Sequence, residues 1–246
     1  MQGLAEHELL PLWEEGEAGD PCRRAAALLA AAAAPDVAPD ALAELTIGER
    51  ETALLALHVR TFASRLEGFV RCPACDQALE VELGESQLRA ILERSPELGE
   101  HDLAVGGFEL RFRLLTCGDL EAASRAVDAA AARRLLVQRS VLSARRNGEA
   151  VAPDALPEDV VAALADRLVA CDPQAEIALA VTCPECGHAW RAVIDAATFL
   201  WSEVSLAARR LLEEVHVLAR SYGWTEAEVL SLSRRRRRLY VELSLS

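Results

Sequence analysis

The chain has 246 residues, 52% of them hydrophobic, which is enough to bury a core in one domain or two. Its net charge of −13 argues against nonspecific binding of the whole protein to nucleic acid. No run of about 18 apolar residues occurs, so a membrane-spanning helix is not expected. The alanine-rich stretch at 25–35 is too short and too far into the chain for a signal peptide. All 26 basic residues are arginine, a bias typical of GC-rich bacterial genomes, and we expect a cytoplasmic bacterial protein.

The N-terminal region, residues 1–67, is predicted to be helical. Asp20 followed by Pro21 is typical of an N-cap and the first position of a helix. Thr46 and Glu49 form a capping box that precedes an apolar helical stripe. The residues of that stripe are Leu54, Leu55, His58, Val59 and Phe62.

Two C-P-x-C motifs, each between two short apolar strands, predict a split zinc ribbon over 68–83 and 176–195. Thiolates at this spacing sit on a tight turn that presents both sulfur atoms to one ion, so two such knuckles supply a tetrahedral set. The absence of a secretion signal favours metal over disulfides. The predicted ligands of one structural Zn²⁺ are Cys72, Cys75, Cys183 and Cys186.

The 107 residues between Cys75 and Cys183 do not forbid this site. Closing such a loop costs roughly 4 kcal/mol in chain entropy, whereas structural zinc contributes about 10–16 kcal/mol in small peptides. Other readings stay open: a rubredoxin-like iron site would use the same sulfur atoms, and two independent knuckles would each need further ligands, such as His188 beside Cys186. A thioredoxin-type dithiol would need a helix directly after the motif, where strands are predicted instead.

The region between the knuckles, 84–175, is predicted to be an insertion of one hairpin and several helices. The hairpin turns at Gly106-Gly107, after which alternate residues from Phe108 to Leu114 point the same way. Predicted helices cover 86–94, about 118–145 and 157–170, with a polar loop joining the last two.

The C-terminal segment, 196–246, has the clearest helical periodicity. Asp195 can cap a long helix, and Gly223 fits just past its end. Thr225 and Glu228 then cap a short helix before a last one. The apolar face of the long helix contains Leu200, Val204, Ala207, Leu211, Val215, Leu218 and Tyr222.

Aromatic residues and an arginine run near this end are the residue types that dominate protein interfaces, and we interpret them as partner-binding. They are Tyr222, Trp224, Arg234, Arg235, Arg236, Arg237, Arg238 and Tyr240. The arginines, about 100° apart on a helix, cannot form one stripe. Docking to an acidic protein surface, contact with phosphate, and a solvated terminal helix that packs Leu239, Tyr240 and Leu243 inward all remain open.

No catalytic motif accompanies the cysteines. The sequence lacks a glycine-rich phosphate loop, an H-E-x-x-H motif and a G-x-S-x-G motif. A metal bound by four sulfur atoms has no coordination position open for substrate. We therefore predict a protein that is not an enzyme and takes no small-molecule substrate, and we assign no catalytic residue.

The order of these segments resembles the T4-type baseplate hub assembly protein (chaperone) family, which is encoded with contractile phage tails and with phage-tail-like contractile injection systems. The resemblance covers most of the chain and the insertion only loosely. The stretches that carry it are "LLPLWEEGEAGDPCRRAAALL", "LTIGERETALLALHVRTF", the two C-P-x-C knuckles and "LARSYGWTEAEVLSLSRRRRRLY".

The resemblance implies a non-enzymatic assembly or structural protein whose partners are baseplate, hub or spike proteins, located in the cytoplasm or within a tail-like particle. The zinc site rests on the residues of this chain and not on the resemblance. Altogether we predict an α+β fold, mainly α-helical, with a small zinc-ribbon-like β module. The alternative function is a zinc-ribbon nucleic-acid-binding or transcription accessory protein, which the acidic composition disfavours, and a metal-dependent enzyme is a further rival.

Overall fold

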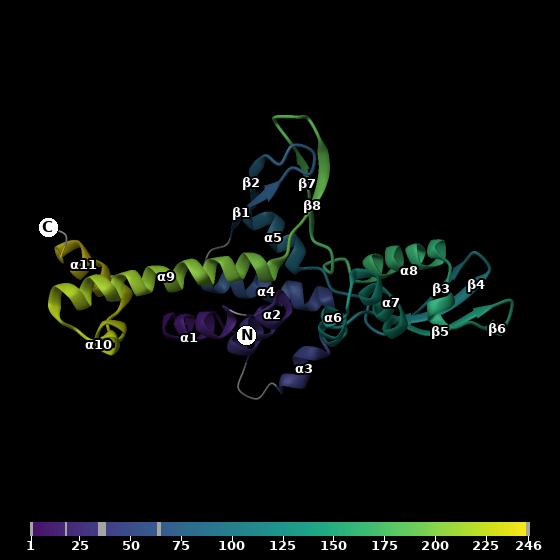
Figure 1. Ribbon diagram of the computed structural model, residues 1–246, viewed down its shortest axis with the longest axis horizontal. Coiled ribbons are helices and arrows are strands. Elements are labelled where there is room, and N and C mark those ends of the chain that lie inside the picture. The colour runs from purple at the N-terminus through teal and green to yellow at the C-terminus, as the bar shows by residue number, and fades with distance from the viewer. Residues whose placement is uncertain (1, 18, 34–37, 63–64, 245–246) are drawn as a thin grey trace.

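A computed structural model describes residues 2–17, 19–33, 38–62 and 65–244 of the protein. It is mainly helical with small antiparallel sheets, which confirms the predicted α+β class (Figure 1). A helical body lies at the centre, two β-hairpins rise from it, and a module with a four-stranded sheet extends to one side. A helical hairpin closes the opposite end. No helix in the described ranges has the length and apolar character needed to cross a bilayer.

The helical body buries the largest apolar cluster of the protein. Leu28, Leu54, Leu55 and Leu200 are completely buried in it, so the apolar stripe predicted after the capping box does face a core. Thr46 and Glu49 form the predicted capping box, and Asp20 accepts a hydrogen bond from the Arg23 backbone. The helices are α1 (Glu6–Gly16), α2 (Pro21–Ala32), α3 (Pro39–Ala43), α4 (Ile47–Thr61) and the first half of α9 (Ala196–Tyr222).

Two buried carboxylates tie distant segments to α4. The N–H of Gly48, in the first turn of α4, donates to Asp172 Oδ2 at 2.9 Å across 124 residues of sequence. Glu51, 4% exposed, accepts from the N–H of Ala196 at the start of α9 and pairs with Arg50. Each contact gives a partner to an N–H group that the start of a helix leaves unsatisfied.

The outer module joins a sheet to two helices. Its strands pair antiparallel in the order β3-β4-β5-β6, and β4 buries Phe108, Leu110 and Phe112 against Val160 and Leu164 of α8. The bounds are β3 (Glu100–Val105), β4 (Phe108–Arg113), β5 (Val141–Arg146), β6 (Glu149–Ala150), α7 (Ala129–Ser140) and α8 (Glu158–Cys171). Helix α5 (Glu85–Leu92) leads into this module, and α6 (Cys117–Ser124), between β4 and α7, contacts both α7 and α2. The turn at Gly106-Gly107 is confirmed, with both glycines in the left-handed region.

The predicted helix over 118–145 was wrong in its last part. The chain leaves α7 at Ser140 and continues as β5, in which Ala144 pairs with Leu110. The loop predicted to follow begins as a hairpin that turns at Asn147-Gly148, both with positive φ. Pairing with β4 buries Val141 and Ala144. This burial stabilises the strand, and it depends on tertiary contacts that the helical propensity of the stretch does not reveal.

The C-terminal arm, made of α10 (Glu226–Ser231) and α11 (Arg234–Ser244), folds back on the end of α9 (Figure 1). Asp195 caps α9, and Gly223 ends it in the left-handed conformation, as predicted. Val229 of α10 is fully buried against Val215 and Leu218 of α9. The arm therefore has a small core of its own.

We predict that Gly48→Ala destabilises the protein by about 2–4 kcal/mol, through overpacking and loss of the buried hydrogen bond. A Cβ at this position would lie 1.8 Å from Asp172 Oδ1. Urea unfolding of the full chain measures the effect. Gly118→Ala is the matched control, since its Cβ would meet the nearest atom at 3.4 Å, and an equal loss there would contradict the assignment.

Candidate metal centre

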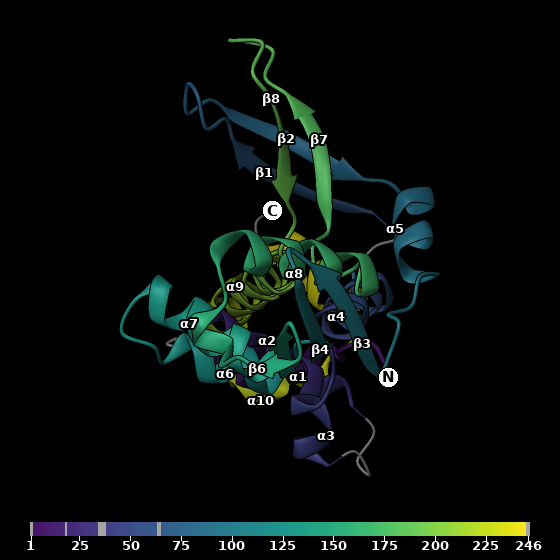
Figure 2. The same cartoon turned by 90° about the vertical axis from the view of Figure 1, so that its right-hand side faces the viewer.

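Two β-hairpins form an arm that rises from one side of the helical body (Figures 1 and 2). Their strands are β1 (Leu66–Arg71) with β2 (Ala78–Leu83), and β7 (Ala178–Thr182) with β8 (Ala189–Val193). At their bases Leu66, Leu83 and Ile194 enter the body's core. Gly68 lets Phe199 of α9 approach closely, because a Cβ there would fall 1.8 Å from the Phe199 ring. The body thus fixes where both hairpins begin.

Both C-P-x-C motifs adopt the same tight turn at the tips of these hairpins. In the first, the N–H of Cys72 donates to the Gln77 carbonyl, and the N–H of Asp76 donates to the Cys72 carbonyl, both at 2.9 Å. Asp76 takes a positive φ of 60° to close the turn. The second repeats both bonds and the left-handed residue with Cys183, Gly187 and His188.

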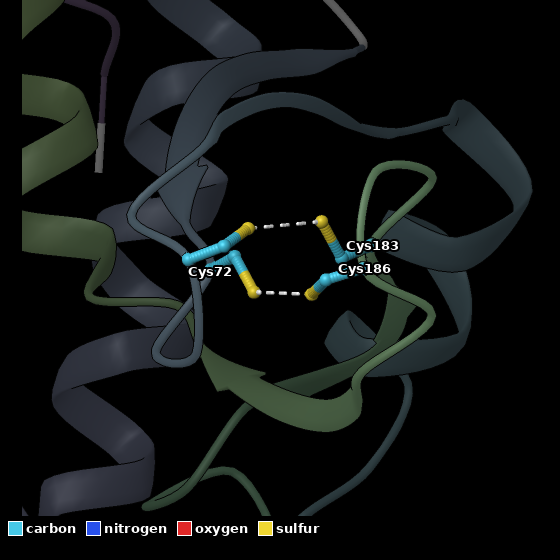
Figure 3. Close-up of side chains that lie close together, drawn as sticks. Cys72, Cys183 and Cys186 are labelled. Carbon is cyan, nitrogen blue, oxygen red and sulfur yellow. Dashed lines mark hydrogen bonds between the residues drawn. The ribbon is translucent and has the colours of Figure 1, made fainter.

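The turns bring the four sulfur atoms together, as predicted. All four lie within 4.8 Å of one another, and the pairs Cys72–Cys186 and Cys75–Cys183 are both 3.6 Å apart (Figure 3). A tetrahedral zinc with Zn–S bonds of about 2.3 Å places its sulfur atoms about 3.8 Å apart. A disulfide would need about 2.05 Å, and the cysteines are free. The donor set therefore fits a closed four-sulfur metal site.

The backbone around Cys72 favours the thiolate form of this one cysteine. Desolvation raises the pKa of the Cys72 thiol, but the N–H groups of Ala74 and Cys75 donate to its sulfur, and the pKa falls to about 7. At Cys75 the Gln77 backbone lowers the pKa, but hydrogen bonds with the other sulfur atoms outweigh it and raise the pKa to about 12. Cys72 and Cys183 are buried, whereas Cys75 and Cys186 lie at the surface. A bound cation would thus be covered on one side by protein and remain near solvent on the other.

The backbone does little to join the two hairpins. Among the described strands, β1 pairs with β2 and β7 with β8, in two separate sheets. The two hairpins of the predicted split ribbon therefore form separate two-stranded sheets, although the knuckles themselves meet. Between the tips, the sulfur cluster spans the two sheets.

The alternative sites predicted for the cysteines fit the geometry less well. Each motif is followed by a strand and not by the helix of a thioredoxin-type dithiol. Independent knuckles are contradicted because sulfur atoms of the two motifs face each other. His188 stacks on Trp190 with ring centroids 5.9 Å apart, and His101 lies beside Cys171.

The predicted partner-binding residues divide into three kinds. Tyr222, Trp224 and Tyr240 contact one another, with ring centroids 4.8–5.8 Å apart, and so join α9 to α11. The prediction was wrong for Arg237, which is 1% exposed. The exposed arginines of α11 are Arg234, Arg235, Arg236 and Arg238.

Arg237 instead holds the C-terminal arm to the body. It forms ion pairs with Glu6 of α1 and Glu214 of α9, and its Nη1 donates to the Leu232 carbonyl. The sequence does not indicate which of the five consecutive arginines is buried, because that depends on which side of α11 packs against α9. Leu239 and Leu243, which would pack inward under the alternative of a solvated terminal helix, are 50% and 65% exposed.

The structure also brings together three metal-ligating side chains that the sequence did not predict to be close. Glu97, His101 and Cys171 lie together although 73 residues lie between Glu97 and Cys171. No spacing motif in the sequence joins these residues, and only the packing of β3 within the outer module places His101 near the end of α8.

Comparison with protein families decides the wider class. The model of the family described as T4 bacteriophage base plate protein matches residues 26–200. The chain belongs to this base plate protein family. The match confirms the predicted resemblance to a phage baseplate family, and it implies contacts with other base plate proteins. Neither the curated proteins nor the solved structures yield a match.

The matched span of this base plate protein runs from α2 to the start of α9. It contains all four cysteines of the sulfur cluster and the whole outer module. It ends before residue 201, so the predicted likeness of the arginine-rich C-terminal stretch to the family stays a prediction.

We predict that Cys183→Ser abolishes binding of the metal held by the sulfur cluster, since three thiolates and a weak hydroxyl cannot replace a four-sulfur set. Metal analysis should show one ion fewer per chain. Hydrogen exchange should show loss of protection at the N–H groups of Asp76 and Gly187. Cys22→Ser is the matched control, and unchanged metal content in Cys183→Ser would remove the site.

We predict that Arg237→Gln destabilises the packing of the C-terminal arm by about 2–3 kcal/mol, less than a fully buried pair because Glu6 and Glu214 are partly exposed. Exposed Arg236→Gln should change stability by less than about 0.5 kcal/mol. Hydrogen exchange of α10 and α11 measures the difference. Equal protection in the two variants would contradict the buried role of Arg237.

Proposed function

We propose that the protein is a non-enzymatic structural or assembly component of a contractile, phage-tail-like baseplate, braced by one structural Zn²⁺. The proposed ligands are Cys72, Cys75, Cys183 and Cys186. The observation that carries the proposal is the convergence of these four sulfur atoms, at distances suited to a tetrahedral ion, in a member of a base plate protein family.

The zinc would act as a brace between hairpins that share no strand pairing. Without it, each two-stranded hairpin is held only at its base, and isolated two-stranded hairpins are marginally stable in water. With it, the tips are crosslinked and the arm becomes one rigid projection. Four sulfur ligands leave no position for substrate, which supports a structural and not a catalytic role.

The C-terminal arm would supply a docking surface for a partner. Its exposed arginines Arg234, Arg235, Arg236 and Arg238 stand beside the exposed apolar side chains of Leu239 and Leu243. A basic patch next to apolar side chains complements an acidic surface that has an apolar patch of its own. Tyr222, 40% exposed at the edge of the aromatic cluster, would extend this surface. The proposed occupant is an acidic face of another baseplate, hub or spike protein.

A capture experiment tests the docking surface. The tagged full chain is purified from cells that express the surrounding tail-like gene cluster, and co-purifying proteins are identified. We predict recovery of baseplate, hub or spike proteins. Changing Arg234, Arg235, Arg236 and Arg238 together to glutamine should reduce that recovery at least about tenfold, since rim charges govern both steering and register.

The matched control changes the same number of exposed arginines elsewhere, with the same change in net charge; it uses Arg94, Arg134, Arg145 and Arg210. This control should retain its partners. Equal loss in both variants would mean a general charge effect and would contradict the docking surface. Recovery of ribosomes, RNA polymerase or DNA without any tail protein would favour the nucleic-acid alternative and overturn the proposed function.

A further inference from the structure

A second cluster of metal-ligating side chains lies in the outer module, away from the sulfur cluster. It joins Glu97, just before β3, with His101 of β3 and Cys171, the last residue of α8. One ligand atom from each of these residues lies within 4.8 Å of the other two. Cys171 is fully buried, His101 is half-buried and Glu97 is exposed, so the cluster has a protein side and a solvent side.

The imidazole of His101 is already set for coordination. Its Nε2 lies 2.7 Å from the Glu97 carbonyl oxygen, and a carbonyl can only accept, so Nε2 carries the proton. The lone pair of the neutral ring is therefore on Nδ1, which faces Cys171 Sγ at 3.7 Å. An imidazole that donates one N–H to a backbone carbonyl while the other nitrogen faces a ligand position is the usual arrangement of metal-binding histidines.

The distances match a shared ion. Bonds of about 2.3 Å from sulfur and about 2.0–2.1 Å from nitrogen, at a tetrahedral angle, place the two donors about 3.6 Å apart. The observed separation of 3.7 Å agrees with this. The frame is held by further contacts: the Glu97 N–H donates to the Cys171 carbonyl at 2.7 Å, and the His101 ring lies 5.3 Å from that of Phe112.

The charges also suit a divalent ion. A thiolate, a neutral imidazole and a carboxylate together carry two negative charges, which a divalent cation neutralises. Arg167 approaches Glu97 at 3.8 Å, with side chains that are 42% and 63% exposed. Such a surface ion pair contributes little, so a cation can displace it.

We infer that Glu97, His101 and Cys171 form a second metal site, which takes a borderline transition-metal ion such as Zn²⁺ and keeps its fourth position for an exchangeable water. This site differs in kind from the four-sulfur site, which is closed. It would clamp the start of β3 to the end of α8. Asp172, the next residue, binds the N–H of Gly48 in α4, so the clamp would stiffen the joint between the outer module and the helical body.

Cobalt titration of the metal-free full chain tests the inference, because Co²⁺ reports both ligand type and open positions in its spectrum. We expect the wild-type protein to take two equivalents with two distinct spectra. Cys183→Ser should lose the intense four-sulfur spectrum and keep the weaker one with a single thiolate. Added azide should change only the weaker spectrum, since only that ion has an exchangeable position.

Substitution of the ligands separates this site from the first one. Cys171→Ser and His101→Gln should each reduce affinity at the second site at least about 100-fold, since even loss of an outer-shell partner costs about 10–100-fold. Both should leave the four-sulfur spectrum unchanged. His101 is only half-buried, so His101→Gln serves if Cys171→Ser fails to fold, with circular dichroism as the check on folding.

Glu97→Gln should weaken the second site without loss of the first, whereas the nearby exposed Glu93→Gln should bind as the wild type does. Saturation of the wild type at one equivalent, with none bound by Cys183→Ser, would overturn the second site and leave the first intact. Wild-type cobalt binding by His101→Gln would also overturn it. If the wild type instead shows the single-thiolate spectrum but no four-sulfur spectrum, the result contradicts the zinc brace and supports the second site.

Discussion

The contacts that α4 makes with distant backbone underlie the rest of the structure. Asp172 binds the first turn of α4, and Glu51 of α4 binds the first turn of α9. The second hairpin, 178–193, lies between these two anchors in sequence, so both of its ends are fixed to the same helix. Burial raises the pKa of both carboxyl groups, and the hydrogen bonds from the orphan N–H groups of the two helix starts offset part of that desolvation cost. These two hydrogen bonds thus fix the position of the second hairpin relative to α4.

That constraint changes the energetics of the sulfur cluster. Folding of the body already offsets the chain-entropy cost of bringing the knuckles together. The hairpin bases are buried with Leu66, Leu83 and Ile194 in the body's core, and this burial does not require an ion. The proposed metal would then have only to order the tips, where two separate sheets face each other through sulfur. Its binding energy would accordingly make the arm rigid and would not be needed to fold the whole protein.

The architecture gives one body three projections with different chemistry: the hairpin arm, the outer module and the basic C-terminal arm. For a member of a base plate protein family, separate projections on a common body fit contact with more than one neighbour. The stretch 221–246 carries five arginines and three acidic residues, so the C-terminal arm is more basic than the chain as a whole, whose net charge is −13. A basic arm favours a defined orientation among partners, since rim charges set register more than affinity.

The sequence by itself determined the features that depend on local chemistry. Caps at Thr46 and Asp195, the left-handed end at Gly223 and the C-P-x-C turns follow from backbone groups within a few residues, and the paired knuckles already indicated one shared ion. The tertiary structure decided what depends on which surfaces meet. It made 141–146 a strand by pairing it with β4, turned Arg237 inward among four exposed arginines, and placed His101 beside Cys171. Periodicity carries no signal for such choices, because burial of a given side chain is set by the neighbour that packs against it and not by its own stretch of chain.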